Sequence, residues 1–312
     1  MRWSRPLLGR SSVPVLCYHN MGGNGMPWQS FTRQIRWLRD SGVRTLSLTE
    51  LDAFLGGEPL CAPSVLLTFD DGFRDLHTRV APLFEELGLR GTVFVINNRI
   101  RPEDEPGTNE DIIAHEAHRA FLTEGNRSAW LSESELTDLV KRDLFDVGSH
   151  SGTHVMGIVS PHERPEKPEH WAYARWHAGL EQGELPRMAP EFTTHLFNAE
   201  AGRPETDGEF FARVRDNLAA SRSDLERRLG KAVTSLGWPW GKAHPIAVDA
   251  AKAAGLRTLF TLANGPVTAG SDPAAINRLE VRRGKGPSWF TSRTIIYSHA
   301  TIAALYAGMR IG

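Results

Sequence analysis

Two adjacent carboxylates, Asp70 and Asp71, directly follow the apolar run 65–69 and precede Gly72. Like charges at this separation repel each other unless a cation lies between them or one of them is protonated. Gly72 lets the backbone turn sharply, so both carboxylates can face the same pocket. Because Asp and Gly are also the ordinary residues of tight turns, the pair alone leaves a structural and a chemical interpretation open.

Two histidines, His150 and His154, follow another apolar run and are separated by three residues. This spacing brings both imidazoles to one side of a helical turn or a compact loop. Such a pair is more often hydrogen-bonded at the surface than part of a ligand set. With one carboxylate, however, two imidazoles form a three-ligand site that leaves a position open for water, as catalytic zinc requires.

A fifth residue, His19, ends the apolar run 13–18 and is a candidate general acid. Its rival is His299, which lies in a carboxyl-terminal segment, 292–309, with small and apolar residues at helical spacing. A helix outside the sheet would carry His299 away from the other groups, so we favour His19. The remaining histidines, His118 among them, have no partner pattern and are predicted to lie at the surface.

The composition is that of a folded globular chain, with 40% apolar and 23% charged residues among 312. It excludes intrinsic disorder and collagen-like repetition. The formal net charge of −1 shows no electrostatic footprint for nucleic acid. No apolar run is long enough for a transmembrane span. The first ten residues are basic but lack the apolar stretch of a signal peptide, so we expect a cytoplasmic protein, compatible with peripheral association with a membrane.

Apolar runs and helix-period segments alternate along the chain, which predicts an α/β fold with parallel strands, either a barrel or a doubly wound sheet. Such folds bind ligands at the carboxyl ends of their strands, where the candidate residues lie. The predicted strands are 13–18, 45–48, 65–69, 91–96, 144–147, 233–236, 258–262 and 279–281. The predicted helices are 30–38, a short one from 49, 76–87, 132–141, 209–229 and 245–254.

Two stretches, 97–130 and 155–208, are too long for ordinary connections and are predicted to be insertions on one rim of the sheet. The second begins directly after the histidine pair and contains Trp171, Tyr173 and Trp176. We therefore expect it to border the site and to act as a lid.

Three of these segments resemble motifs of the polysaccharide deacetylase family, whose NodB-homology domain is a distorted (β/α)7-type barrel. Residues 68–72 resemble the first motif, 150–154 the second, and the Trp238-Pro239-Trp240-Gly241 segment the third. The run 13–19 is similar to the opening strand of a circularly permuted subgroup that deacetylates β-1,6-linked poly-N-acetylglucosamine. On this resemblance, residues 13–290 form the deacetylase domain, 1–12 an extension and 291–312 a carboxyl-terminal helix.

The resemblance implies a role for each matching residue. Asp70 would be the general base and His19 the general acid. Asp71, His150 and His154 would bind one divalent metal, zinc before cobalt or nickel. The third motif, Trp238, Pro239, Trp240 and Gly241, would bind substrate, with the Trp240 N–H contacting the oxyanion. One departure concerns the arginine that often opens this motif to hold the base: Gly237 takes its place, and either Lys242 or Arg278 is a candidate substitute.

The implied activity is removal of N-acetyl groups from a hexosamine-containing glycan. Two alternatives are a deacylase of a small or lipid-linked amino sugar at the cytoplasmic membrane face, and a glycan-binding module without catalysis. The retained carboxylate pair argues against the binding module, because binding alone does not need two adjacent like charges. A serine hydrolase is excluded, since the centre of the Gly148–Gly152 segment is His150 rather than serine.

Overall fold

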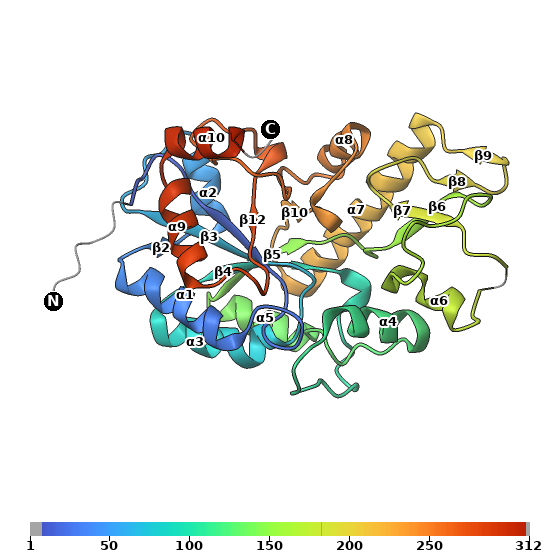
Figure 1. Cartoon of the computed structure of the whole chain (residues 1–312), viewed down its shortest axis with the longest axis horizontal. Coiled ribbons are helices and arrows are strands. Elements are labelled where there is room, and N and C mark those ends of the chain that lie inside the picture. The colour runs from blue at the N-terminus through green and yellow to red at the C-terminus, as the bar shows by residue number, and fades with distance from the viewer. Residues whose placement is uncertain (1–7, 182, 310–312) are drawn as a thin grey trace.

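Parallel strands form one sheet at the centre of the structure, a computed structural model that describes residues 8–181 and 183–309 (Figure 1). The strand order is β11-β10-β5-β4-β3-β1-β12, with β2 beside β3. A parallel bridge between Phe260 and Ile276 connects β11 to the segment that leads into β12. The two ends of the sheet therefore meet, and the predicted α/β barrel is confirmed. The strands are β1 (Val15–Tyr18), β2 (Arg44–Thr45), β3 (Ser64–Phe69), β4 (Gly91–Val95), β5 (Phe145–Ser149), β10 (Ser235–Gly237), β11 (Thr258–Phe260) and β12 (Leu279–Glu280).

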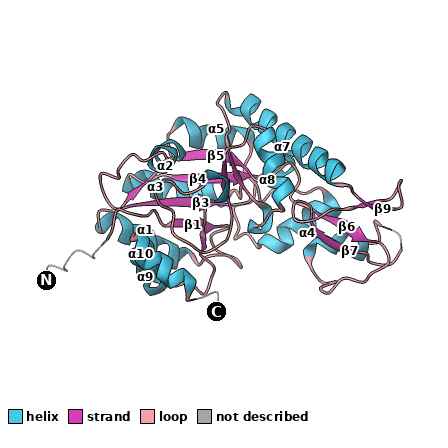
Figure 2. Cartoon of the chain, turned by 90° about the horizontal axis from the view of Figure 1, so that it is seen from above, coloured by secondary structure: helices cyan, strands magenta, loops and turns pink. Residues whose placement is uncertain are grey.

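Helices cover the outside of the sheet (Figure 2). The longest of them, α7, buries Phe210, Val214, Leu218 and Leu225, which share one helical face. All six residues of β3 are buried, as expected for a parallel strand that is covered on both faces. The covering helices are α1 (Trp28–Asp40), α2 (Leu48–Leu55), α3 (Ala81–Leu87), α5 (Glu133–Lys141), α7 (Asp207–Leu229), α8 (Pro245–Ala253), α9 (Pro287–Tyr297) and α10 (Ala300–Gly308).

Two predicted elements differ in the structure. The strand expected over 45–48 is shorter, because Ser47 and Glu50 form a capping box that starts α2 at Leu48. The single helix expected over 291–312 is two helices, α9 and α10, which break at Ser298 and His299. Residues 1–7 of the expected extension and residues 310–312 lie outside the described part of the chain.

The two insertions lie beyond one side of the barrel, on the right of Figure 1. The first carries α4 (Ala114–Glu124). The second carries two antiparallel strand pairs and a short helix, α6 (Ala174–His177). Its strands are β6 (Met156–Ser160), β7 (Arg187–Pro190), β8 (Phe197–Asn198) and β9 (Arg203–Pro204).

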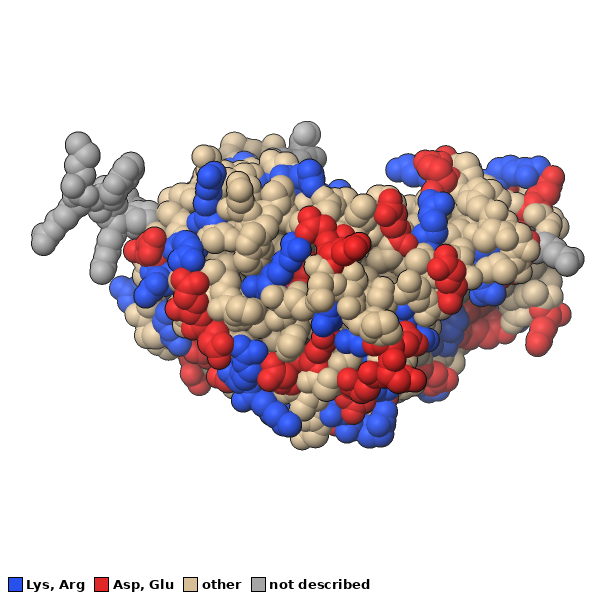
Figure 3. All heavy atoms as spheres, turned by 90° about the horizontal axis from the view of Figure 1, so that it is seen from below, with Lys and Arg blue, Asp and Glu red and all other residues tan. Residues whose placement is uncertain are grey.

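Acidic and basic side chains are interspersed over the face shown in Figure 3, in line with the near-zero net charge. Within residues 8–181 and 183–309, no helix has both the length and the apolar character needed to cross a bilayer.

Candidate active site

The candidate residues lie at the carboxyl ends of neighbouring strands. The pairing of Tyr18 with Phe69 places His19 next to Asp70. The pairing of Leu236 with Ser149 places Gly237 next to His150. The register of the parallel sheet thus brings residues far apart in the sequence to one rim, as the strand-end argument predicts.

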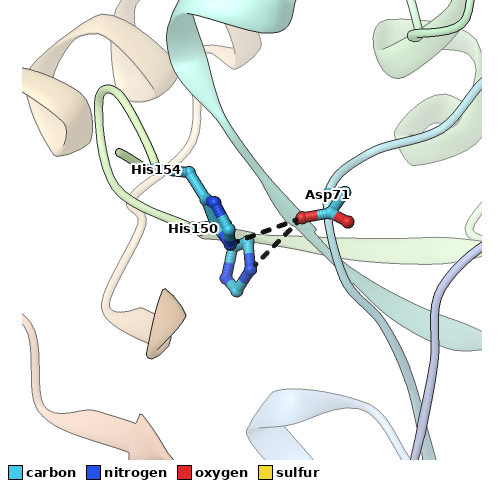
Figure 4. A group of neighbouring side chains, drawn as sticks. All are labelled: Asp71, His150 and His154. Carbon is cyan, nitrogen blue, oxygen red and sulfur yellow. Dashed lines mark ion pairs between the residues drawn. The ribbon is translucent and has the colours of Figure 1, made fainter. Parts of the chain in front are cut away.

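Asp71, His150 and His154 form a buried cluster whose potential ligand atoms all lie within 4.8 Å of one another (Figure 4). Asp71 Oδ1 is 3.5 Å from His150 Nε2 and 3.8 Å from His154 Nε2. Asp71 and His154 have φ values of 72° and 48°, in the left-handed region that costs energy for side chains other than glycine. The turns at both motifs are therefore held in an unfavourable conformation that directs these side chains together.

The atoms of this cluster fit a divalent cation. His150 Nδ1 lies 2.7 Å from the Gly237 carbonyl oxygen, to which it donates a hydrogen bond, so Nε2 keeps a free lone pair toward Asp71. Asp71 Oδ1 is buried without a hydrogen-bond partner among the described residues. Two imidazole nitrogens and one carboxylate oxygen are a usual ligand set for catalytic zinc.

The protonation states of His150, His154 and Asp71 also favour metal binding. Burial lowers the pKa of His150 and lowers that of His154 well below its ordinary value, so both rings are neutral and able to act as ligands. Burial alone would raise the pKa of Asp71, but contacts with His118 and His154 lower it well below its ordinary value. The carboxylate is therefore ionised near neutral pH.

Asp70 is held by a bidentate ion pair with Arg278, at 2.7 and 2.9 Å. Both side chains are buried. The candidate substitute for the missing arginine is therefore Arg278, because Lys242 is exposed at the surface. Cys17 lies behind the pair, with its Sγ 3.4 Å from Asp70 Oδ2.

A cavity of about 460 Å³ opens over these groups. It is large enough for a sugar unit, since pockets for small ligands start at roughly 300 Å³. His19 lines the cavity and is half-buried, whereas His299 is absent from the lining and packs beside Gly9. The lining comprises His19, Asn24, Asp70, Asp71, Ala114, His115, His118, His150, His154, Trp171, Trp240, Gly241, Leu262, Glu280 and Arg282.

Two tryptophans from different parts of the chain form an aromatic wall of the cavity. Trp240 follows β10 and lies 4.1 Å from His154, measured between ring centroids. Trp171, from the insertion 155–208, is parallel to Trp240 within 10° at 6.1 Å. The prediction that this insertion borders the site therefore agrees with the structure, although Tyr173 is buried away from the cavity.

The predicted substrate contacts of Trp238 and Pro239 are wrong. Trp238 is fully buried, packs 5.8 Å from Phe192 and belongs to the apolar core beneath α7 and α8. Pro239 is buried too, outside the cavity lining. The backbone turns at Trp240, whose φ is 55°, so Trp240 and Gly241 reach the cavity while the two residues before them face the core.

His118 was not expected at the site, and its predicted surface position is wrong. This side chain of α4 is only 4% exposed, and its Nε2 lies 3.5 Å from Asp71 Oδ2. One signal could have found it: with Ala114, Ala117 and Phe121 it forms one stripe at helical spacing. A histidine on the inward face of a helix in a rim insertion is a candidate site residue.

The loop that carries His150 and His154 is held by hydrogen bonds to side chains of the second insertion and of α7. Glu191 accepts hydrogen bonds from the Thr153 hydroxyl at 2.7 Å and the Val155 N–H at 3.4 Å. Asn217 accepts one from the Gly152 N–H at 3.0 Å. These contacts fix the backbone between His150 and His154.

Comparison with known proteins supports the family resemblance of the three motifs. Residues 57–259 match the family model described as polysaccharide deacetylase. The chain is 22% identical over 233 residues to the poly-β-1,6-N-acetyl-D-glucosamine N-deacetylase of Escherichia coli K12. The aligned region covers 74% of this chain and 30% of that protein. The chain spans about a third of the length of the curated relatives that it matches.

Solved structures share the fold. The deacetylase domain of BpsB from Bordetella bronchiseptica superposes with a TM-score of 0.66 at 22% identity, over 86% of this chain and 96% of that one. A de-N-acetylase from Aggregatibacter actinomycetemcomitans gives 0.68 at 18% identity, over 90% and 99%.

Proposed function

The chain belongs to the polysaccharide deacetylase family, and we propose that it is a metal-dependent N-deacetylase acting on a hexosamine-containing glycan. The observation that carries the proposal is the arrangement at one cavity of an arginine-held carboxylate, Asp70, beside the Asp71, His150 and His154 cluster. In the reaction, water adds to the acetamide carbon and the C–N bond breaks. The products are acetate and a free amino sugar.

Asp71, His150 and His154 would hold the metal. A divalent cation in such a site supplies Lewis-acid polarisation of the acetyl carbonyl and makes water easier to deprotonate. The donor set suits zinc first, with cobalt and nickel as further candidates.

Asp70 would take the proton from the attacking water. Burial would raise the pKa of Asp70, but Arg278 and His150 lower it below its ordinary value, so the carboxylate is ionised and can accept a proton. The bidentate contact also fixes the plane of the carboxylate, which a base needs in order to meet the proton in line.

His19 would protonate the leaving amine, because an amine is too basic to depart as an anion. It lines the same cavity as the two tryptophans and directly follows β1. The Trp240 backbone N–H is a candidate donor to the oxyanion of the tetrahedral intermediate. Trp171 and Trp240 would stack on the apolar face of the pyranose ring.

For the substrate we propose polymeric or oligomeric β-linked N-acetylhexosamine, supported by the printed activity of the Escherichia coli relative. The test is acetate release from N-acetylglucosamine polymers, oligomers and nucleotide- or lipid-linked N-acetyl sugars. It is run before and after metal removal by a chelator and after metal is added back.

The expected result is acetate release that is lost with the chelator, restored by the metal and reduced about 10²–10⁴-fold in the Asp70→Asn variant. Release that is insensitive to the chelator would contradict metal dependence. Binding of the oligomers without acetate release under any condition would favour the glycan-binding module.

A further inference from the structure

The two carboxylate oxygens of Asp71 face different partners. Oδ1 lies toward the two metal-type histidines, at 3.5 Å from His150 and 3.8 Å from His154, and has no hydrogen-bond partner among the described residues. Oδ2 lies on the other side, 3.5 Å from Nε2 of His118. The carboxylate is therefore divided between the ligand cluster and a side chain of the first insertion.

The His118 ring packs in a cluster of aromatic rings. Trp171 lies parallel to it at 4.5 Å and 18°, and His154 lies on the cluster side at 5.8 Å and 18°. Phe73 and Trp130 make T-shaped contacts with the same ring at 5.8 and 5.4 Å. Because the ring cannot rotate without displacing these neighbours, the direction of its Nε2 is set by packing.

Packing alone does not explain a histidine at this position. The other ring nitrogen, Nδ1, is buried without a hydrogen-bond partner among the described residues, which costs free energy. A phenyl ring would fill the same space beside Trp171 and His154 without an unsatisfied atom. The gain that offsets this cost is the contact between Nε2 and Asp71.

A role as a fourth ligand does not fit the geometry. In the part of the chain that the structure describes, the atoms of Asp71, His150 and His154 lie within 4.8 Å of one another, and His118 does not belong to this group. A fourth protein ligand would also close the coordination position that a hydrolytic metal site keeps for water.

We propose that His118 is a positioning residue for the metal ligand Asp71. Its Nε2–H donates to Oδ2, which holds the carboxylate plane so that Oδ1 points at the cation. The inference rests on the proposed function, because it assumes a cation bound by Asp71, His150 and His154. It also gives both insertions a part in the site: α4 of the first carries His118, and Trp171 of the second packs on the His118 ring.

The test compares two substitutions with opposite losses. His118→Phe keeps the stacked ring and removes the N–H, whereas His118→Gln keeps an N–H donor at similar reach and removes the ring. Each purified variant is loaded with Co²⁺. Metal affinity is measured by competition with a chelator, the coordination geometry by visible absorption, and kcat and KM by acetate release. His77→Phe, outside the cavity lining, is the matched control.

His118→Phe should bind metal about 10–100-fold more weakly, the usual effect of removing a group that orients a metal ligand. Its Co²⁺ spectrum should change, and kcat should fall with little change in KM. His118→Gln should recover most of the affinity and the wild-type spectrum. Wild-type affinity and spectrum in His118→Phe would overturn the inference. A wild-type protein that binds no metal would instead overturn the proposed function.

A measurement on the unmodified protein covers the case in which His118→Phe does not fold. In the ¹¹³Cd-loaded, ¹⁵N-labelled protein, two histidine rings should couple to cadmium, and the His118 ring should carry its proton on Nε2. Three coupled rings, or an unprotonated Nε2 at His118, would overturn the positioning role.

Discussion

Arg278 places Nη1 and Nη2 at 2.7 and 2.9 Å from the two oxygens of Asp70, although 208 residues separate the pair in the sequence. Both side chains are buried, so the charges compensate each other in a place where either alone would be costly. Arg278 directly precedes β12, which pairs with β1. The segment that leads into β12 therefore supplies the arginine that is absent at Gly237.

Replacing Arg278 should show how strongly the function of Asp70 as the base depends on this ion pair. We expect Arg278→Lys to fold but to lose about 10²-fold in kcat, because one ammonium cannot fix the carboxylate plane. The pKa of Asp70 should rise when the guanidinium is lost, so the acidic limb of the kcat/KM profile should move to higher pH. The measurement is a pH–rate profile of both proteins. An unchanged limb would show that Asp70 is not the base.

Arg278→Ala should lower the free energy of unfolding by about 3–5 kcal/mol, because it leaves a buried charge unpaired.

The adjacent carboxylates should separate by function. Asp71→Asn should reduce bound metal, since it removes the ligand charge, whereas Asp70→Asn should retain metal and lose turnover by about 10²–10⁴-fold. Metal per protein is measured by mass spectrometry after gel filtration, beside acetate release. Equal metal loss in both variants would show that the two roles are wrongly assigned.

The sequence could predict the metal-type cluster because its three residues lie in two short motifs at strand ends. A parallel sheet brings strand ends together whatever the details of its packing. The barrel was predictable for a similar reason, since the alternation of apolar runs and helical segments is a local signal repeated along the chain.

The remaining site residues reach the cavity through tertiary packing, which a local pattern such as the helical stripe of His118 does not specify. His118 depends on how α4 of the first insertion docks on the rim, and Arg278 was a candidate that the sequence could not separate from Lys242. Trp238 shows the opposite error. The motif alone does not show which of Trp238 and Trp240 contacts substrate. The turn at Trp240 decides which of the two side chains leaves the core.

The two candidate acids should differ sharply. His19 lines the cavity, and His299 lies at the start of α10 beside Gly9. His19→Ala should therefore lower kcat by about 10²–10⁴-fold with little change in metal affinity. His299→Ala should leave kcat near the wild-type value. Acetate release and Co²⁺ affinity of both variants test this, and the reverse order would assign the acid to the carboxyl-terminal segment.

The two neighbouring tryptophans should respond through different properties. Trp240→Ala should raise KM for oligomeric substrate, because the ring belongs to the cavity wall, with a small effect on stability. Trp238→Ala should instead lower the free energy of unfolding by about 3–5 kcal/mol, as expected for a cavity left by a buried aromatic ring. Urea unfolding and steady-state kinetics separate the two effects. A rise in KM without loss of stability in Trp238→Ala would return that residue to the substrate site.

A buried carboxyl outside the cluster should control how stability varies with pH. Asp75 is 4% exposed and accepts a hydrogen bond from the Met21 N–H through Oδ2, while Oδ1 has no partner among the described residues. Burial raises its pKa to about 7, although Met21 and Arg79 oppose the shift. In the unfolded chain its pKa is about 3.9. The folded protein therefore holds a proton over this interval that the unfolded chain releases.

The sign of the effect follows from this difference. Where the folded state binds more protons, the free energy of unfolding decreases as pH rises, so Asp75 should lower stability progressively from about pH 4 to pH 7, with a constant penalty above that. The full penalty is on the order of 4 kcal/mol, from three pKa units. Asp75→Asn, which can still accept from Met21, should remove it. The measurement is urea unfolding of both proteins from pH 5 to pH 8. The stability difference should grow with pH in favour of the variant and then level off, and parallel curves would show that Asp75 keeps an ordinary pKa in the folded protein.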